Sequence, residues 1–445
     1  MRRPQLPLPR RAAPRRATPR RPATVRAAAV AALLLAVGCK ELTTLEQDAP
    51  SRVLGSDLYR PANAQLLVTS AVSDYECALA SYIVAAGLVS DELVDAQLSQ
   101  VGWDYDRRTV TPALTAYALN ACGSIQVPGV YTPISVARAS ADAVLKALQG
   151  WSDAEVPNRQ SLIAQAAAHA GYALLLLGEG MCSAAIDGGP ELSRAQLFQE
   201  AEGRFTTAIA AAQASNNAAM LATARVGRAR ARLDLGRPAD ARADALAVPV
   251  GFVQNATYSP ANFRRENLVH TQLYRGNFSS VDPSFRGLTV GGVPDPRLGV
   301  VDAGTVGMDR TTPIWRTTKY PAVGSPIPIA SWDEAQLIVA EGELAAGNVP
   351  AAVAAINALR RRANVAEYAG GTAAEVRAQL LEERRRELFL EGHRLGDVIR
   401  YQLTLTPAAG TPYPVKGGVY GTQLCFPLPD VERNNNPTLN GGRGT

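Results

Sequence analysis

The chain has 445 residues, of which 47% are hydrophobic and 19% are charged. This composition supports a large folded core and excludes wholesale disorder. The formal net charge of +5 suggests a nucleic-acid partner, but nine arginines and no acidic residue stand within residues 1–38. The rest of the chain holds 36 basic and 40 acidic residues, so its net charge is −4 and we expect no nucleic-acid partner.

The N-terminal segment has the pattern of an export signal. An arginine- and proline-rich stretch precedes the apolar run Ala27–Val37, which is shorter than the roughly 20 residues that span a bilayer. Leu35-Ala36-Val37-Gly38-Cys39 resembles a bacterial lipobox, whose cysteine is lipidated and becomes the first mature residue. We therefore predict a signal peptide over residues 1–38 and a lipid anchor on Cys39. An ordinary secretion signal with a coincidental cysteine is the alternative.

Four cysteines follow the predicted anchor, namely Cys77, Cys122, Cys182 and Cys425. Disulfides persist in the oxidising environment that an exported protein meets, and four cysteines allow three pairings, between which the sequence does not choose. We favour Cys77–Cys122, which closes the shorter loop, and Cys182–Cys425, which ties a mid-chain loop to the tail. No CxxC occurs and the three histidines lie far from the cysteines in sequence, so we expect neither a metal nor a cofactor.

Helical patterning dominates the chain and predicts a mainly α fold. The predicted helices are Asn158–Gly178, Arg194–Ala214, Asn217–Leu235, Pro238–Ala247, Trp332–Ala346, Pro350–Ala363 and Ala373–Arg400. Residues 249–330 differ, because Pro, Gly, Asn and aromatic residues rise there and apolar periodicity disappears. This region is predicted to be an irregular insertion with short strands, and a long irregular region inside a domain is often functional.

Three predicted helix ends share one pattern, at Gly178, Gly236 and Gly347. A leucine lies three residues before each glycine and a small residue lies seven before it, while Ala241 and Ala352 follow two of them by five residues. Small residues let antiparallel helices approach closely, and a helix-ending glycine is typical of tetratricopeptide repeats. We predict tetratricopeptide-like hairpins over about 131–248 and 331–401; generic alanine-rich hairpins are the alternative.

A run of six charged residues, Glu382–Glu387, lies inside the last predicted helix. Helical geometry places Arg384 on the same stripe as Leu381 and Leu388, so its side chain is expected to point inward against a carboxylate or against helix ends. A buried ion pair of this kind fixes one packing arrangement. The predicted members of a structural ion network are Arg384, Glu387 and Arg394.

The stretch from Glu382 to Arg394, followed by Asp397 and Arg400, closely resembles the signature of the SusD/RagB family of nutrient-binding outer-membrane lipoproteins. Shorter segments of the chain resemble other motifs of the family less strongly, and they occur in the same order along the chain as in the family. They are Tyr131–Ala143, Asp295-Pro296-Arg297, Lys319-Tyr320, Glu334–Glu341, Ile356–Arg360 and Pro427–Pro437. Together with the lipobox, the resemblance covers roughly residues 39–440.

This resemblance implies a single SusD-like domain over residues 39–445, with tetratricopeptide helices on one flank and a loop-rich ligand-binding part. It also implies a lipoprotein anchored to the outer membrane and facing the cell exterior. Such proteins capture an oligosaccharide or other nutrient and act as the lid of a SusC-like TonB-dependent β-barrel transporter, without changing the ligand. The acidic residues Glu41, Glu46 and Asp48 are similar to the surface-export signals of this group.

Ligand residues vary within the family, so candidates come from the chain itself. Aromatic rings stack on the apolar faces of sugars, whose hydroxyls need polar partners. The ligand-binding candidates are Trp103, Asp104, Tyr105, Tyr274 and Trp315. Trp151 and Trp332 stand at predicted helix starts and are expected to pack in the core. Because aromatic residues make up only 6% of the chain, a peptide or another nutrient remains an open ligand class.

Two other functions fit parts of the sequence. A glycan-degrading enzyme needs a catalytic carboxylate pair, which 40 acidic residues could supply, but no GxSxG, HExxH or phosphate-binding loop occurs. We therefore expect no enzyme. A periplasmic tetratricopeptide scaffold lipoprotein would bind protein segments in its grooves, but this function leaves the irregular middle and the C-terminal signature without a role.

Overall fold

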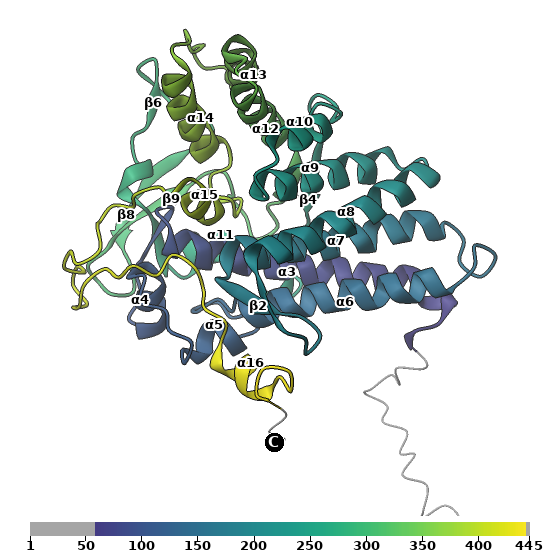
Figure 1. Ribbon diagram of the computed structural model, residues 1–445. Helices are drawn as coiled ribbons and strands as arrows, with labels where there is room; N and C mark the ends of the chain where they lie inside the picture. Colours follow the sequence, from purple (N-terminus) through teal and green to yellow (C-terminus); the bar gives the residue numbers. More distant parts are fainter. Residues whose placement is uncertain (1–57, 442–445) are drawn as a thin grey trace, which may run out of the picture. The chain divides into compact units, whose positions relative to one another are not determined.

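The computed structural model describes residues 58–441 (Figure 1). The predicted signal peptide, Cys39, Glu41, Glu46 and Asp48 lie outside the described residues. The helices of the N-terminal half are α3 (Ala64–Val89), α4 (Gln100–Asp106), α5 (Thr115–Leu119), α6 (Tyr131–Gly150), α7 (Arg159–Gly180), α8 (Arg194–Ala214), α9 (Ala218–Asp234) and α10 (Pro238–Ala245). The later helices are α11 (Leu268–His270), α12 (Trp332–Ala345), α13 (Val349–Arg362), α14 (Ala373–Glu387), α15 (Arg394–Tyr401) and α16 (Asp430–Asn435).

The strands are short and pair only in twos among the described residues. They are β1 (Leu93–Asp95), β2 (Ser183–Ala185), β3 (Glu191–Ser193), β4 (Val253–Ala256), β5 (Ser279–Val281), β6 (Thr289–Val290), β7 (Val293–Pro294), β8 (Val300–Val306), β9 (Pro313–Thr317) and β10 (Ile327–Ser331). The antiparallel pairs are β1–β5, β2–β3, β4–β10, β6–β7 and β8–β9. The predicted fold class, mainly α with short strands in an irregular part, is confirmed.

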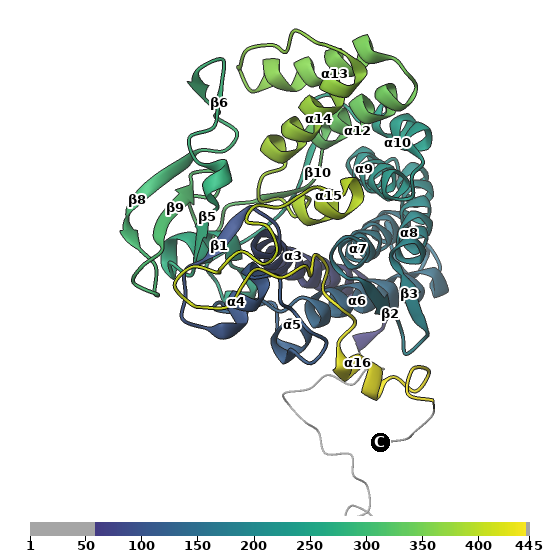
Figure 2. The ribbon, with the colours of Figure 1, turned by 60° about the vertical axis from the view of Figure 1, so that its left-hand side comes forward.

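The helical layer follows the chain, with α6, α7, α8 and α9 packed in succession and α10, α12, α13 and α14 continuing beyond them (Figures 1 and 2). Its central helix, α7, is buried on nearly all sides. The segment Pro61–Val89, which includes α3, and α7 are long and apolar enough to cross a membrane, but 83% and 89% of their apolar windows are buried within the fold. Both are therefore core helices of this protein.

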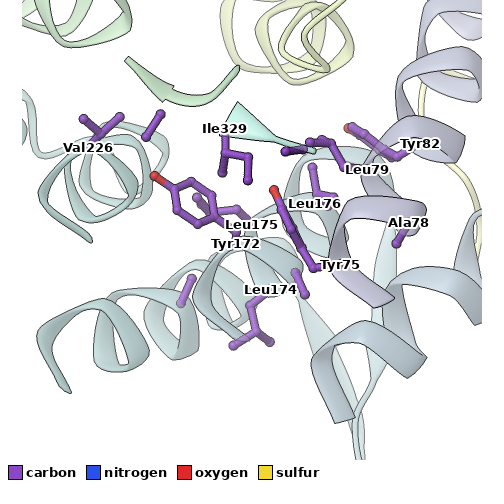
Figure 3. Packing of buried hydrophobic residues seen from close by; sticks show 14 of the residues in the cluster. Tyr75, Ala78, Leu79, Tyr82, Tyr172, Leu174, Leu175, Leu176, Val226 and Ile329 are labelled. Atoms are coloured by element: carbon purple, nitrogen blue, oxygen red, sulfur yellow. The ribbon is translucent and has the colours of Figure 1, made fainter. Parts of the chain in front are cut away.

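Helix α3, which lies outside the predicted helices, forms a large part of the core. Figure 3 shows Tyr75 and Tyr82 of α3 among side chains of α7 that include Tyr172 and Leu176. The ring centroids of Tyr75 and Tyr172 lie 6.0 Å apart, and both side chains are buried. An all-apolar helix shows little amphipathic periodicity, which explains why a search for one apolar stripe does not detect it.

Two of the three glycines of the repeat pattern end their helices as predicted. Gly236 and Gly347 follow α9 and α12 with φ angles of +73° and +76°, the left-handed conformation of a helix C-cap. The prediction for Gly178 is wrong, because α7 continues to Gly180. A Cβ on Gly178 would lie 2.4 Å from the ring of Phe198 in α8, so this glycine is needed for close helix packing.

The predicted single helix Ala373–Arg400 is also wrong, because the chain breaks between α14 and α15. Leu390 and Gly392 have φ angles of +53° and +88°, which no α-helix accommodates. The carboxylate of buried Glu92 accepts a hydrogen bond of 2.7 Å from the Leu390 backbone N–H. Tertiary contacts thus stabilise a turn where the charged pattern alone predicts continuous helix.

Both favoured disulfides are present in the structure. Cys77 pairs with Cys122 and Cys182 pairs with Cys425, with Cα–Cα distances of 5.5 and 5.1 Å. The second bridge ties the C-terminal tail to the chain just after α7. Cys182 also donates its backbone N–H to Phe426 O at 2.9 Å, so the tail runs beside α7 before reaching α16. This path carries residues 403–425 across the loop-rich part (Figure 2).

Candidate functional site

A hollow of about 340 Å³ lies in the loop-rich part, bounded by β1, α4, the β8–β9 connection and the C-terminal segment. It is lined by Val94, Asp95, Asp106, Asp282, Pro283, Arg286, Thr311, Thr312, Pro313, Pro407, Tyr413, Pro414, Val415, Lys416 and Tyr420. Prolines and valines supply apolar walls, while carboxylates, hydroxyls and two cations supply polar groups. Apolar walls with a few placed polar groups are the usual composition of a small-molecule site.

Two tyrosines stand at the base of the hollow. The rings of Tyr413 and Tyr420 meet edge to face with centroids 5.1 Å apart, and each residue is only 6% exposed. Arg108 covers the ring of Tyr420 at 4.8 Å. The Tyr413 hydroxyl donates to Asp106 at 2.8 Å, and burial raises the pKa of the Asp106 carboxyl to about 7. The tyrosines therefore present ring edges rather than a wide stacking face.

Lys416 is one of the two cationic side chains that line the hollow. Its ammonium contacts Asp95 Oδ2 at 2.5 Å and Asp309 Oδ2 at 3.2 Å, and it donates to the Asp95 carbonyl at 2.9 Å. Burial raises the pKa of Asp95 to about 6, although the charge of Lys416 opposes this shift. All three N–H donors of Lys416 are used, so this residue organises the wall and offers no free donor to a ligand.

Arg286 carries the second cation and links the hollow to a predicted candidate, Trp315. Its guanidinium lies 5.2 Å from the Trp315 ring centroid, while its Nε and Nη2 donate to the Val281 carbonyl at 2.9 and 2.7 Å. Burial lowers the pKa of Arg286, and no carboxylate lies within ion-pair distance of it in the described part of the chain. Both hydrogens of Nη1 and the second hydrogen of Nη2 therefore make no hydrogen bond within the described chain.

Trp103 lies on α4, a short helix that precedes Arg107 and Arg108. Its indole N–H donates to the Gln97 carbonyl at 3.0 Å, and Lys416 Nζ lies 5.8 Å from its ring centroid. Asp104 pairs with Arg107 at 2.7 Å and accepts from Thr109 at 2.8 Å, so its carboxylate is engaged within the α4 end. Trp103 contacts Lys416 and Trp315 contacts Arg286, the two cationic side chains that line the hollow. Neither tryptophan lines the hollow itself.

The remaining predicted candidates have other surroundings. Tyr105 is fully buried, and its hydroxyl donates to the Pro128 carbonyl at 2.8 Å, which makes it a core residue. The Tyr274 ring is stacked on His270 at 4.7 Å and lies 4.9 Å from the Arg316 guanidinium. The Tyr274 hydroxyl donates to the Thr317 carbonyl at 2.9 Å, so this residue is engaged within the protein. Trp151 ends α6 instead of starting a helix.

The predicted ion-network residues enter three separate ion pairs. Arg384, buried on α14, makes two hydrogen bonds of 2.8 and 2.9 Å to Asp397, whose pKa falls because this charge outweighs the effect of burial. Glu387 lies 3.2 Å from Arg297. The guanidinium of Arg394 binds Asp91 at 2.5 and 2.7 Å. The first pair joins α14 to α15, and the other two join these helices to distant segments of the chain, which is a structural role.

A second hollow, of about 530 Å³, lies among the helices of the repeat region. The ends of α9 and α12, the start of α14 and the end of α15 form its walls, with Leu233, Leu344 and Leu380 among the lining residues. Among residues 58–441, no group of three or more His, Cys, Asp or Glu side chains is arranged to hold a metal ion.

Sequence reasoning missed Tyr413, Tyr420, Lys416 and Arg286. A usable signal was present, because residues 403–425 are rich in Gly, Pro and Thr and carry two tyrosines, the same pattern that singled out Trp315.

Comparisons with known proteins complete the site description. Residues 334–440 match the model of the SusD family. No curated protein matches the chain. A SusD-like carbohydrate binding protein from Bacteroides vulgatus superposes with a TM-score of 0.64 at 15% identity, over 87% of this chain and 98% of that one.

Two further solved structures are similar. A SusD superfamily protein from Bacteroides fragilis gives a TM-score of 0.63 at 13% identity, covering 86% of this chain and 99% of that one. A laminarin binding SusD-like protein gives 0.59 at 15% identity, covering 83% and 96%. The shared fold thus spans nearly the whole length of each of these proteins.

Proposed function

Because the chain belongs to the SusD family by its fold and by the sequence of residues 334–440, we propose that it captures an oligosaccharide at the cell surface and delivers it to a TonB-dependent outer-membrane transporter. It is a binding protein and not an enzyme, as is usual for this family. The SusD-like neighbours described as carbohydrate binding and laminarin binding support a glycan as the ligand class.

The observation that carries this proposal is the hollow beside β1 and the C-terminal segment. Its proline and valine walls suit the C–H faces of sugar rings, and its carboxylates, its threonines and the free Nη1 of Arg286 suit hydroxyl groups. Most of its charges are compensated within the protein, as with Lys416 between Asp95 and Asp309. This balance favours an uncharged ligand with many hydroxyls.

The sequence supports the cellular placement. The lipobox-like ending of the export signal at Cys39 predicts an acyl anchor, and each buried methylene of such a chain contributes about 0.8 kcal/mol to membrane affinity. We propose that the protein sits on the outer face of the outer membrane, where its partner is a SusC-like β-barrel transporter. Affinity purification of the tagged protein is expected to recover that transporter, and its absence would refute the lid function.

A glycan array, with a peptide array alongside, tests the ligand class. The expected result is binding to one family of neutral oligosaccharides, weakened in Trp315→Ala and Trp103→Ala, because each tryptophan supports a cation at the hollow. Binding to peptides alone would overturn the glycan proposal. Unchanged glycan binding in both variants would remove the tryptophans from the site.

The hollow among the repeat helices favours a second candidate function, a periplasmic scaffold that binds protein segments. The two functions place the protein on opposite sides of the outer membrane. Protease treatment of intact cells separates them, because a surface protein is cleaved and a periplasmic one is protected.

A further inference from the structure

Residues 407–421, named here the flap, form one wall of the hollow but bury little of themselves. Tyr413 and Tyr420 are the only buried residues of the flap. Val415 and Val419 are 67% and 49% exposed. A segment with few buried apolar contacts opens locally at a lower free energy than the core around it.

The flap is nevertheless ordered internally as a small hairpin. The Tyr413 N–H donates to the Gly418 carbonyl at 2.9 Å, and the Tyr420 N–H donates to the Thr411 carbonyl at 2.9 Å. These hydrogen bonds lie wholly within the flap, so they survive if the flap moves away from the rest of the molecule. The flap is therefore built to move as one unit.

Polar contacts to Arg107 and Arg108, which directly follow α4, attach the flap at its tip and at its two ends. Arg107 Nη1 donates to the Gly417 carbonyl at 3.1 Å, and the Gly421 N–H donates to the Arg107 carbonyl at 2.6 Å. Arg108 donates to the Pro407 carbonyl. Two of these bonds are donated by guanidinium groups, and none of the three is an ion pair.

Two buried side-chain contacts attach the flap: the Tyr413 hydroxyl donates to Asp106 at 2.8 Å, and Lys416 makes the only ion pairs of the flap among the described residues. The Lys416 side chain is 5% exposed, while those of Asp95 and Asp309 are both fully buried. These two carboxylates belong to β1 and to the β8–β9 connection, so one ammonium joins the flap to two other walls of the hollow. Removing the ammonium would leave two buried carboxylates facing each other without a cation.

We propose that the flap opens as a unit to admit ligand to the hollow, and that Lys416 is the positioning residue that holds it shut. The identity of the ligand rests on the proposed function, whereas the movement of the flap does not. Opening needs the loss of the Lys416 contacts, of the Tyr413–Asp106 hydrogen bond and of the bonds to Arg107 and Arg108, and it leaves the helical layer unchanged.

Hydrogen exchange of the full-length protein tests whether Lys416 holds the flap closed. In Lys416→Met, which keeps the aliphatic stem, the amide of Gly421, which donates to Arg107 outside the flap, is expected to exchange at least about tenfold faster, while the amides of α7 keep their wild-type rates. Lys146→Met is the matched control, because Lys146 is exposed on α6 and makes no ion pair in the described chain. Unchanged exchange in the flap, or faster exchange throughout, would overturn the proposal.

Thiol labelling tests whether opening exposes the hollow. Val94 lines the hollow from β1, and the four cysteines of the described chain are paired, so a thiol at Val94→Cys is distinguishable by mass spectrometry of its peptide. Adding Lys416→Met is expected to speed its reaction with N-ethylmaleimide at least about tenfold. An unchanged rate would refute the gating role. Neither measurement uses a ligand, so their failure is distinct from failure of glycan binding.

Discussion

Replacement of Arg384 by leucine is the sharpest test of the ion pairs that join α14 and α15. The Arg384 side chain is 5% exposed, and its two hydrogen bonds to Asp397 bridge the turn that interrupts the predicted helix. Arg384→Leu preserves volume and apolar contacts with the neighbouring leucines. It leaves Asp397 buried, with Arg400 at 3.4 Å as its remaining partner in an ion pair.

Removing one partner of a buried pair costs about 3–5 kcal/mol, because the other charge loses its main partner; Arg400, at 3.4 Å, compensates Asp397 only in part. An unfolding entropy of about 2.1 cal/mol/K per residue, applied to the described chain, gives roughly 0.8 kcal/mol/K. The melting temperature of Arg384→Leu is therefore expected to fall by about 4–6 °C.

Calorimetry of three variants measures this effect. Arg361→Leu is the control, because Arg361 makes an exposed pair with Glu367 and its loss should shift the melting temperature by less than about 1 °C. Arg384→Leu combined with Asp397→Leu is expected to recover more than half of the loss, since no buried charge is stranded. A single Arg384→Leu variant that melts with the wild type would refute the buried-pair reasoning.

Three further changes test the hollow, the helix contacts and the tail. Burial raises the pKa of Asp106 to about 7, so its neutral form stabilises the fold below the ordinary pKa of 3.8 and this contribution is lost as the pH rises through 7. Asp106→Asn should flatten that fall in urea titrations from pH 4 to 8, and an unchanged slope would contradict the shift. Gly178→Ala should cost about 1–3 kcal/mol of unfolding free energy through its clash with Phe198, measured by urea denaturation, and a neutral effect would exclude the clash. Replacing Cys182 and Cys425 together by serine should cost about 2–5 kcal/mol in the same assay, and a melting temperature equal to that of the wild type would rule out a stabilising bridge.

Helix positions were largely predictable because most helices carry local signals. The Ser193 cap before α8 and the glycines after α9 and α12 fix helix ends through short-range hydrogen bonds and left-handed turns. Helix α3 escaped detection because its burial on most sides removes the amphipathic stripe. The break after α14 depends on Glu92, almost 300 residues away, and no local pattern contains that contact.

The site was less predictable than the fold. Trp103 and Trp315 lie beside the hollow, but the ring edges that line it belong to Tyr413 and Tyr420, in a segment that no predicted helix or family motif covers. The tail reaches the hollow because it is attached to α4 and fastened by the Cys182–Cys425 disulfide. Such long-range pairings follow from tertiary packing, and a single sequence does not encode them in any local pattern.

Calorimetric titration of a hollow-blocked variant with the oligosaccharide that the array selects tests the central claim most directly. Thr311 is exposed and lines the hollow, so Thr311→Trp fills it without removing a buried group, and Thr69→Trp on the exposed side of α3 is the matched control. The account predicts wild-type affinity for Thr69→Trp and a loss of at least about tenfold for Thr311→Trp. Equal affinity in all three proteins would place the ligand elsewhere and contradict the assignment of the hollow.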